Sequence, residues 1–155
     1  MTHLKIITIL FFLTTTIKAS YAQHHDHLHS ENEIGLSSSA VYSPDHKEWG
    51  TGIHVHYFRM LSPHSKWSLG GGIEGVFADD KHFSFNAGVK YEVINRLSIS
   101  LLPGILFVKP SFSLHTEIVY DLFHWENFHL GTAIDYSWSK DDSHFAVGIH
   151  AAYCF

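Results

Sequence analysis

The segment His144–Phe155 constrains the fold most, because its side chains alternate strictly in character. Every second residue counted back from the end forms an apolar face of Phe155, Tyr153, Ala151, Ile149, Val147 and Phe145. The opposite face consists of Cys154, Ala152, His150, Gly148, Ala146 and His144. Successive side chains of a β-strand point to opposite faces. An apolar face bounded by aromatics, opposite small or titratable residues, is typical of a strand between lipid and a filled barrel lumen.

Seven earlier segments alternate in the same way and are separated by polar turns. They are Asn32–Tyr42, Trp49–Leu61, Trp67–Ala78, His82–Ile94, Leu97–Val108, Phe112–Phe123 and Phe128–Ser139. Each has about the 9 to 11 residues that a tilted strand needs to cross the apolar part of a bilayer. Leu102-Pro103-Gly104 interrupts the fifth segment. Proline lacks the ladder donor and glycine permits a bulge, so the sequence leaves the register beyond Pro103 open.

The alternation also fits a soluble, lipocalin-like barrel whose apolar face points inward. An eight-stranded barrel, however, has an interior only just wide enough for side chains. Here the apolar face is rich in aromatics, whereas the other face is rich in Gly, Ser and Ala. Small residues suit a narrow lumen and bulky ones suit lipid. We therefore predict an all-β fold, an eight-stranded antiparallel up-and-down transmembrane β-barrel over residues 32–155, with both termini on one side.

The first 22 residues have the features of a signal peptide. Lys5 precedes an apolar run that is too short for a membrane helix, and Ser20-Tyr21-Ala22 offers a cleavage site before Gln23. The expected mature chain has eight basic and fifteen acidic residues, a formal charge of −7 with histidine neutral, which argues against a nucleic-acid partner. The single cysteine, Cys154, cannot form an internal disulfide.

These features resemble the small outer-membrane β-barrels of Gram-negative bacteria, the OmpA/OmpX-like class. The resemblance rests on the signal peptide, the eight alternating segments and a last strand that ends in Tyr153-Cys154-Phe155. It implies an outer-membrane location, contact with outer-membrane lipid, and a periplasmic C-terminus whose closing aromatic the barrel-assembly machinery recognises. It also implies that residues 23–31 form a periplasmic tail. The class includes adhesins, anchors and enzymes, so the resemblance indicates an architecture and not an activity.

Histidine is unusually frequent in this chain, and the tail holds His24, His25, His27 and His29. Imidazole suits zinc, copper and nickel ions, so the tail is a candidate site for a divalent transition metal. With cleavage before Gln23, His25 would be the third residue. Its imidazole, the free amine and two backbone nitrogens can then form a square-planar site for copper(II) or nickel(II). The alternative is a solvated polar spacer without a ligand.

A second set of candidate metal ligands falls on the lumen face. These residues are His54, His56, His115, His129 and His150. They can converge in a closed barrel, because its first strand lies between the last and the second. The alternative is a structural polar core, in which Lys90 and the histidines pair with lumen carboxylates such as Glu74 and Glu92. The choice depends on the stagger of the strands, which the sequence leaves open.

An enzymatic function has weaker support. His82-Phe83-Ser84-Phe85-Asn86 is similar to the His-x-Ser-Asn stretch of outer-membrane lipid A deacylases, but Phe85 separates Ser84 from Asn86. His82 and Ser84 also fall on the lumen face, whereas a lipid substrate requires them to face the membrane. We therefore predict a non-enzymatic outer-membrane barrel that binds a divalent metal, with a purely structural barrel as the alternative. Conduction is not expected, since a filled eight-stranded lumen is no pore.

Overall fold

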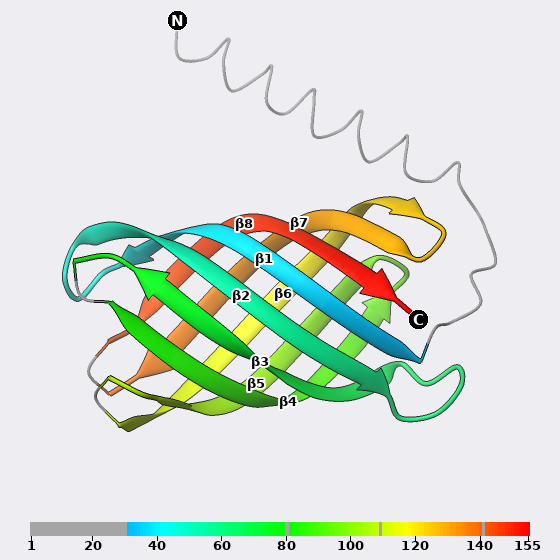
Figure 1. The fold of residues 1–155 in the computed structure, drawn as a ribbon, viewed down its shortest axis with the longest axis horizontal. Helices are drawn as coiled ribbons and strands as arrows, with labels where there is room; N and C mark the ends of the chain where they lie inside the picture. The colour runs from blue at the N-terminus through cyan, green and yellow to red at the C-terminus, as the bar shows by residue number, and fades with distance from the viewer. Residues whose placement is uncertain (1–30, 80, 109, 141) are drawn as a thin grey trace, which may run out of the picture.

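The computed structural model describes residues 31–79, 81–108, 110–140 and 142–155. The signal peptide and all four tail histidines lie outside these ranges. Eight antiparallel strands follow one another around a closed barrel in chain order (Figure 1). They are β1 (Asn32–Ser43), β2 (Glu48–Met60), β3 (Trp67–Phe77), β4 (His82–Ile94), β5 (Leu97–Leu106), β6 (Ser111–Trp125), β7 (Phe128–Ser139) and β8 (His144–Cys154). None of the described residues belongs to a helix long and apolar enough to span a membrane.

All eight predicted strands are confirmed, and their bounds agree closely. β4 and β7 have the predicted bounds, and the other ends differ by at most two residues. The largest extension is in β6, which continues through Trp125. A register shift between Asp121 and Phe123 accompanies this extension. The turn between β6 and β7 therefore begins at Glu126.

The interruption at Pro103 does not change the register. Leu102, Pro103 and Gly104 pair in unbroken succession with consecutive residues of β6. On the side of β5 that faces β4, Leu101 pairs with Val89 and Gly104 pairs with Asn86, and both pairs belong to one register. The pattern looked broken because Leu102 is an apolar residue on the lumen face, where it is fully buried. The irregularity between β4 and β5 lies near the turn, between Glu92 and Ile94.

Closure joins the two ends of the described chain. β1 pairs with β8, and the Asn32 amide donates to the Phe155 carbonyl at 3.0 Å while the Phe155 amide donates back at 2.9 Å. A closed sheet has no free edge. The start of β1 and the end of β8 therefore share one opening of the barrel, here called the terminal mouth (Figure 1). The opposite opening, where β1 ends at Ser43 and β8 begins at His144, is the distal mouth.

Most of the large apolar side chains cover the outside of the barrel, and the buried titratable ones lie in its lumen. Ile134 and Tyr153 are 54% and 49% exposed, whereas Glu117 and His150 are 1% and 3% exposed. Large exposed apolar residues occur on every strand. Soluble monomers seldom expose contiguous apolar patches beyond a few hundred Å². This arrangement excludes the lipocalin-like alternative and gives the barrel an exterior suited to hydrocarbon.

The lumen contains a polar core of ion pairs and hydrogen bonds. Its centre contains the buried carboxylates of Glu74, Glu117 and Asp135. The imidazole of His115 lies between two of them, with Nδ1 3.5 Å from Glu74 Oε2 and Nε2 3.5 Å from Asp135 Oδ1. Ser37 donates a hydrogen bond to Glu117 at 3.2 Å. Buried charges require such partners, because the low dielectric of the interior penalises each unpaired ion.

Replacing Ile134 with arginine tests which surface meets lipid. Ile134 lies in the middle of β7 and points outward. A charge on the lipid face near the bilayer midplane costs about 2–4 kcal/mol, and one near the interface costs about 0–1 kcal/mol. We expect Ile134→Arg to lower the free energy of unfolding in phospholipid vesicles by the larger amount. The matched control is Leu61→Arg, at an exposed residue in the turn after β2. Equal effects of both variants would contradict an outward lipid face.

Replacing His115 with alanine tests the polar core. The change removes the imidazole between Glu74 and Asp135, and breaking a buried ion pair typically costs about 3–5 kcal/mol. We expect a loss of that size in urea-unfolding experiments followed by tryptophan fluorescence. His46→Ala, at an exposed turn residue, should change stability by no more than about 0.5 kcal/mol. A His115→Ala barrel as stable as the His46→Ala barrel would contradict this account of the core.

Candidate metal centre

Among the residues that the structure describes, three groups of histidines and carboxylates have the composition and closeness of metal ligands. The first is Glu33, His56 and His150; the second is His54, His115 and Glu117; the third is His82, Asp142 and His144. Within each group, one potential ligand atom from every residue lies within 4.8 Å of the others. Each group combines two imidazoles with one carboxylate, a donor set found in zinc proteins.

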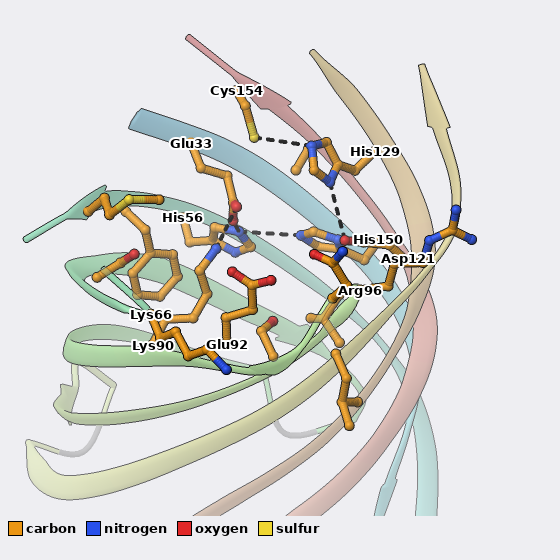
Figure 2. A pocket seen from close by; sticks show the side chains of 18 of the residues that line it. Glu33, His56, Lys66, Lys90, Glu92, Arg96, Asp121, His129, His150 and Cys154 are labelled. Atoms are coloured by element: carbon orange, nitrogen blue, oxygen red, sulfur yellow. Dashed lines mark hydrogen bonds and ion pairs between the residues drawn. The ribbon is translucent and has the colours of Figure 1, made fainter. Parts of the chain in front are cut away.

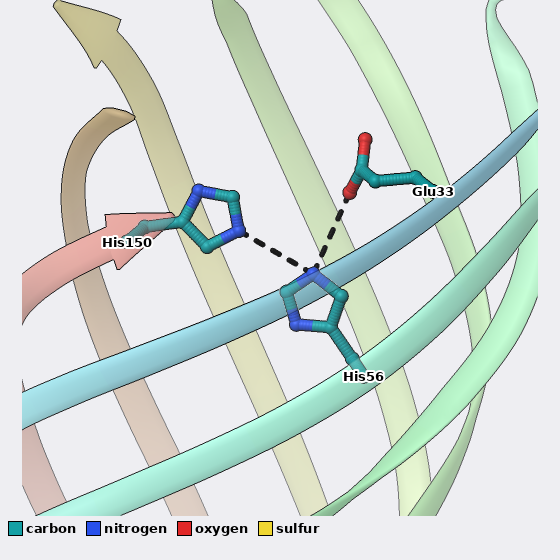
Figure 3. Close-up of side chains that lie close together, drawn as sticks. All are labelled: Glu33, His56 and His150. Atoms are coloured by element: carbon teal, nitrogen blue, oxygen red, sulfur yellow. Dashed lines mark hydrogen bonds and ion pairs between the residues drawn. The ribbon is translucent and has the colours of Figure 1, made fainter. Parts of the chain in front are cut away.

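The first group has the most suitable spacing. His56 Nε2 lies 3.4 Å from His150 Nε2 and 3.5 Å from Glu33 Oε1 (Figure 3). Nitrogen ligands about 2.0–2.1 Å from a tetrahedral zinc ion are about 3.3 Å apart. Both separations therefore approximate edges of a tetrahedral site.

Barrel closure and a glycine bring this group together. β1 lies between β2 and β8, so His56 and His150, 94 residues apart in sequence, approach one another across it. Gly35 of β1 pairs directly with His56. A Cβ atom at Gly35 would lie 2.2 Å from His56 Nε2 and 2.9 Å from His150 Nε2. The absence of a side chain at residue 35 thus provides the space in which the two imidazoles meet.

The first group lines a cavity of about 170 Å³ at the terminal mouth (Figure 2). Lys90 also lines this cavity and forms an ion pair with Glu33 Oε2, which leaves Oε1 facing His56. The Lys90 ammonium in addition lies 5.0 Å from the centroid of the Phe58 ring, a cation–π contact. The cavity gives an ion or a water molecule a route to the first group from the terminal mouth.

His129 lines the same cavity but belongs to a different set of contacts. Its Nδ1 lies 3.2 Å from Asp121 Oδ2 and its Nε2 lies 3.4 Å from Cys154 Sγ (Figure 2). The five lumen histidines named from the sequence therefore lie in three places. His56 and His150 meet at Glu33, His54 and His115 meet near Glu117, and His129 stands with Asp121 and Cys154.

The second group is deeper in the barrel, and all three of its residues are buried. The ring centroids of His54 and His115 are 5.0 Å apart, and His54 Nδ1 is 3.8 Å from Glu117 Oε1. Both ring nitrogens of both histidines lack hydrogen-bond partners within the described part of the chain. His115 also forms ion pairs with Glu74 and Asp135, so the second group is part of the charge network of the core.

The third group lies at the distal mouth. His82 Nδ1 is 3.1 Å from Asp142 Oδ2, and this contact, the largest influence, holds the pKa of the Asp142 carboxyl below its ordinary value. Sequence reasoning named neither this group nor Glu33 as metal ligands. Alternation does assign Glu33, His82 and His144 to the lumen face, but Asp142 is in a turn, where no periodicity predicts its direction.

The lumen position of the candidate hydrolase residues is confirmed. Ser84 is 1% exposed, donates a hydrogen bond to Glu74 Oε2 at 3.3 Å and accepts one from Asn86 Nδ2 at 2.8 Å. His82 contacts Asp142. Ser84 thus faces away from the surface where lipid would bind, and its hydroxyl is part of the polar core.

Comparisons with known proteins identify the fold. No family model matches the sequence, and no curated protein matches it. Neisserial surface protein A has a similar structure (TM-score 0.57, 10% identity, 80% of this chain and 96% of that chain). So has Ail, the attachment invasion locus protein of Yersinia pestis (TM-score 0.55, 18% identity, 83% and 99%). A de novo designed transmembrane β-barrel matches with a TM-score of 0.51 at 15% identity over 86% and 100%. This chain has the fold of the small eight-stranded outer-membrane barrels.

Proposed function

We propose that this chain is an integral outer-membrane protein that binds a divalent transition-metal ion in its lumen, through Glu33, His56 and His150. The observation that carries the proposal is the 3.4 Å separation of His56 Nε2 and His150 Nε2, next to a carboxylate oxygen of Glu33. We place both termini in the periplasm, the apolar exterior in outer-membrane lipid, and the C-terminal strand as the part that the barrel-assembly machinery recognises. The terminal mouth then opens to the periplasm.

The donor set indicates which ions fit the site and whether they can exchange. Two imidazoles and one carboxylate suit zinc, and also copper and nickel, better than calcium or magnesium, which prefer oxygen ligands alone. Three protein ligands leave a fourth tetrahedral position, as in zinc sites that bind water or a further ligand. Glu33, His56 and His150 all line the 170 Å³ cavity, which has room for such a further ligand. We therefore propose an exchangeable ion in this site.

The His-rich tail has a place in the same proposal. Residues 23–31 immediately precede Asn32 in the sequence, and Asn32 is the first residue of β1, which begins at the terminal mouth. We propose that the tail forms a second, independent set of donors that captures ions close to the lumen site.

A purely structural barrel is the competing function, and the Lys90–Glu33 ion pair favours it. This ion pair already neutralises Glu33. His56 and His150 can also share a hydrogen bond, with one nitrogen donating and the other accepting. In that case the histidines complete the polar core without an ion. Metal titration distinguishes the two functions directly.

Titration of the folded mature chain in detergent tests the lumen site separately from the tail. The reference variant has His24, His25, His27 and His29 replaced by asparagine. We expect this reference to bind zinc in isothermal titration, and His56→Asn in the same background to weaken the terminal-mouth site at least about 100-fold, because it removes a ligand. His129→Asn, at the same mouth, is the matched control and should leave that affinity unchanged. Identical titrations of the reference and the His56→Asn variant would remove the terminal mouth as a metal site.

The tail is tested by comparing the wild-type chain with the reference variant. We expect the wild type to bind at least one more zinc ion, because four additional imidazoles are present. Equal stoichiometry in the two proteins would leave the tail as a polar spacer. The lumen site would be unaffected by that result.

A methyl group at residue 35 tests the space between the imidazoles without removing a donor. We expect Gly35→Ala to lower zinc affinity at the terminal mouth by about 10-fold or more, since its Cβ would overlap His56 Nε2. Gly52→Ala is the control, because it adds the same methyl group against Ser39 and Val41, toward the distal mouth. Folding of both variants is checked by the mobility of unboiled protein on a detergent gel. A folded Gly35→Ala barrel with unchanged zinc affinity would contradict the assigned geometry.

A further inference from the structure

We propose a second, separate site for a divalent transition-metal ion at the distal mouth, formed by the imidazoles of His82 and His144 together with the carboxylate of Asp142. It lies at the opposite end of the barrel from the terminal-mouth site and shares no residue with it. It does not depend on the function proposed above.

Residues from non-adjacent strands converge at this mouth. His82 is the first residue of β4 and His144 is the first residue of β8, and these strands are not neighbours in the barrel. Their ring centroids are nevertheless 5.1 Å apart. Asp142, in the turn that precedes β8, completes a group whose ligand atoms lie within 4.8 Å of one another.

A carboxylate contacts each imidazole, and the two contacts have different roles. His144 Nε2 contacts Glu74 Oε1 at 3.3 Å. Metal-binding histidines usually donate one ring N–H to such a carboxylate, which orients the ring and leaves the other nitrogen to bind the ion. The atoms available to an ion are then His144 Nδ1 together with His82 Nδ1 and Asp142 Oδ2, which are 3.1 Å apart, close to the edge of a tetrahedral site.

One of these nitrogens is buried without a partner. His144 is 2% exposed, and its Nδ1 lacks a hydrogen-bond partner in the part of the chain that the structure describes. A buried polar atom without a partner destabilises the folded state, so such atoms in native proteins usually have a ligand or an ordered water. A bound metal ion would satisfy this nitrogen.

The surroundings provide a space of suitable size. His82, Asp142 and His144 line a small pocket of about 10 Å³, close to the space that a single water molecule occupies. Val41 and Val76, which pack with Ala146 in a buried apolar cluster, also line it. The pocket therefore combines the three potential ligands with an apolar wall. With periplasmic termini, this mouth faces the cell exterior.

Cobalt(II) titration of the full mature chain tests the distal site, because the visible absorption of cobalt reports its coordination by nitrogen and oxygen. The background again carries asparagine at His24, His25, His27 and His29. We expect this protein to bind two cobalt ions. The His82→Asn variant should bind only the ion at the terminal mouth, and the His56→Asn variant only the ion at the distal mouth. Asp142→Asn should weaken cobalt binding at the distal site at least about 100-fold, because it removes a ligand. His46→Asn, at an exposed residue of the same mouth, should behave like the background.

The outcomes separate this site from the terminal-mouth site. A background that binds one ion, with binding abolished by His56→Asn and unchanged by His82→Asn, would overturn the distal site and leave the proposed function intact. If the background binds one ion and His82→Asn abolishes that binding, the terminal-mouth site is overturned and the distal site stands. No binding at all would overturn both. Gel mobility of unboiled protein verifies folding, and His82, which is less buried than His144, provides the variant expected to fold.

Discussion

The hydrogen-bonded junction of β1 with β8 is the constraint on which the rest of this structure depends. It closes the sheet, so the described strands have no free edge, and it encloses half of the side chains of each strand in a narrow lumen. It also places His150 next to β1 and so within reach of His56 on the other side of that strand. Without closure, these histidines would lie near opposite edges of an open sheet, on β2 and β8.

The enclosed side chains determine the electrostatics of the molecule. Glu74, Glu117 and Asp135 lie in an interior surrounded by strands and, outside them, by an apolar surface, so each carboxylate needs a partner inside the barrel. Histidine suits this role, because each ring offers two nitrogens that can donate, accept or bind an ion. The same property makes a polar core built from histidines and carboxylates a set of potential metal sites, with one accessible group near each mouth.

The strands and the direction of their side chains were predictable from sequence, and particular residues show why. Alternation assigned Ile134 and Tyr153 to the outside and Glu117 and His150 to the lumen, and all four lie there. The same rule was hard to apply at Leu102, because an apolar residue on the lumen face resembles a break in the pattern. The bulges near Glu92 and Asp121 had no signal of their own, since a register shift depends on the paired strand.

The amino-acid sequence by itself determined the number of strands, their faces and the abundance of histidine and carboxylate in the lumen, because a period of two is a local property of the backbone. Only the tertiary structure decided which lumen residues meet. Stagger and closure brought Glu33 to His56 and His150, and His82 to His144, whereas His129 lies apart with Asp121 and Cys154. The position of each side chain along the barrel axis depends on pairing between strands that are distant in sequence, and no local pattern encodes that pairing.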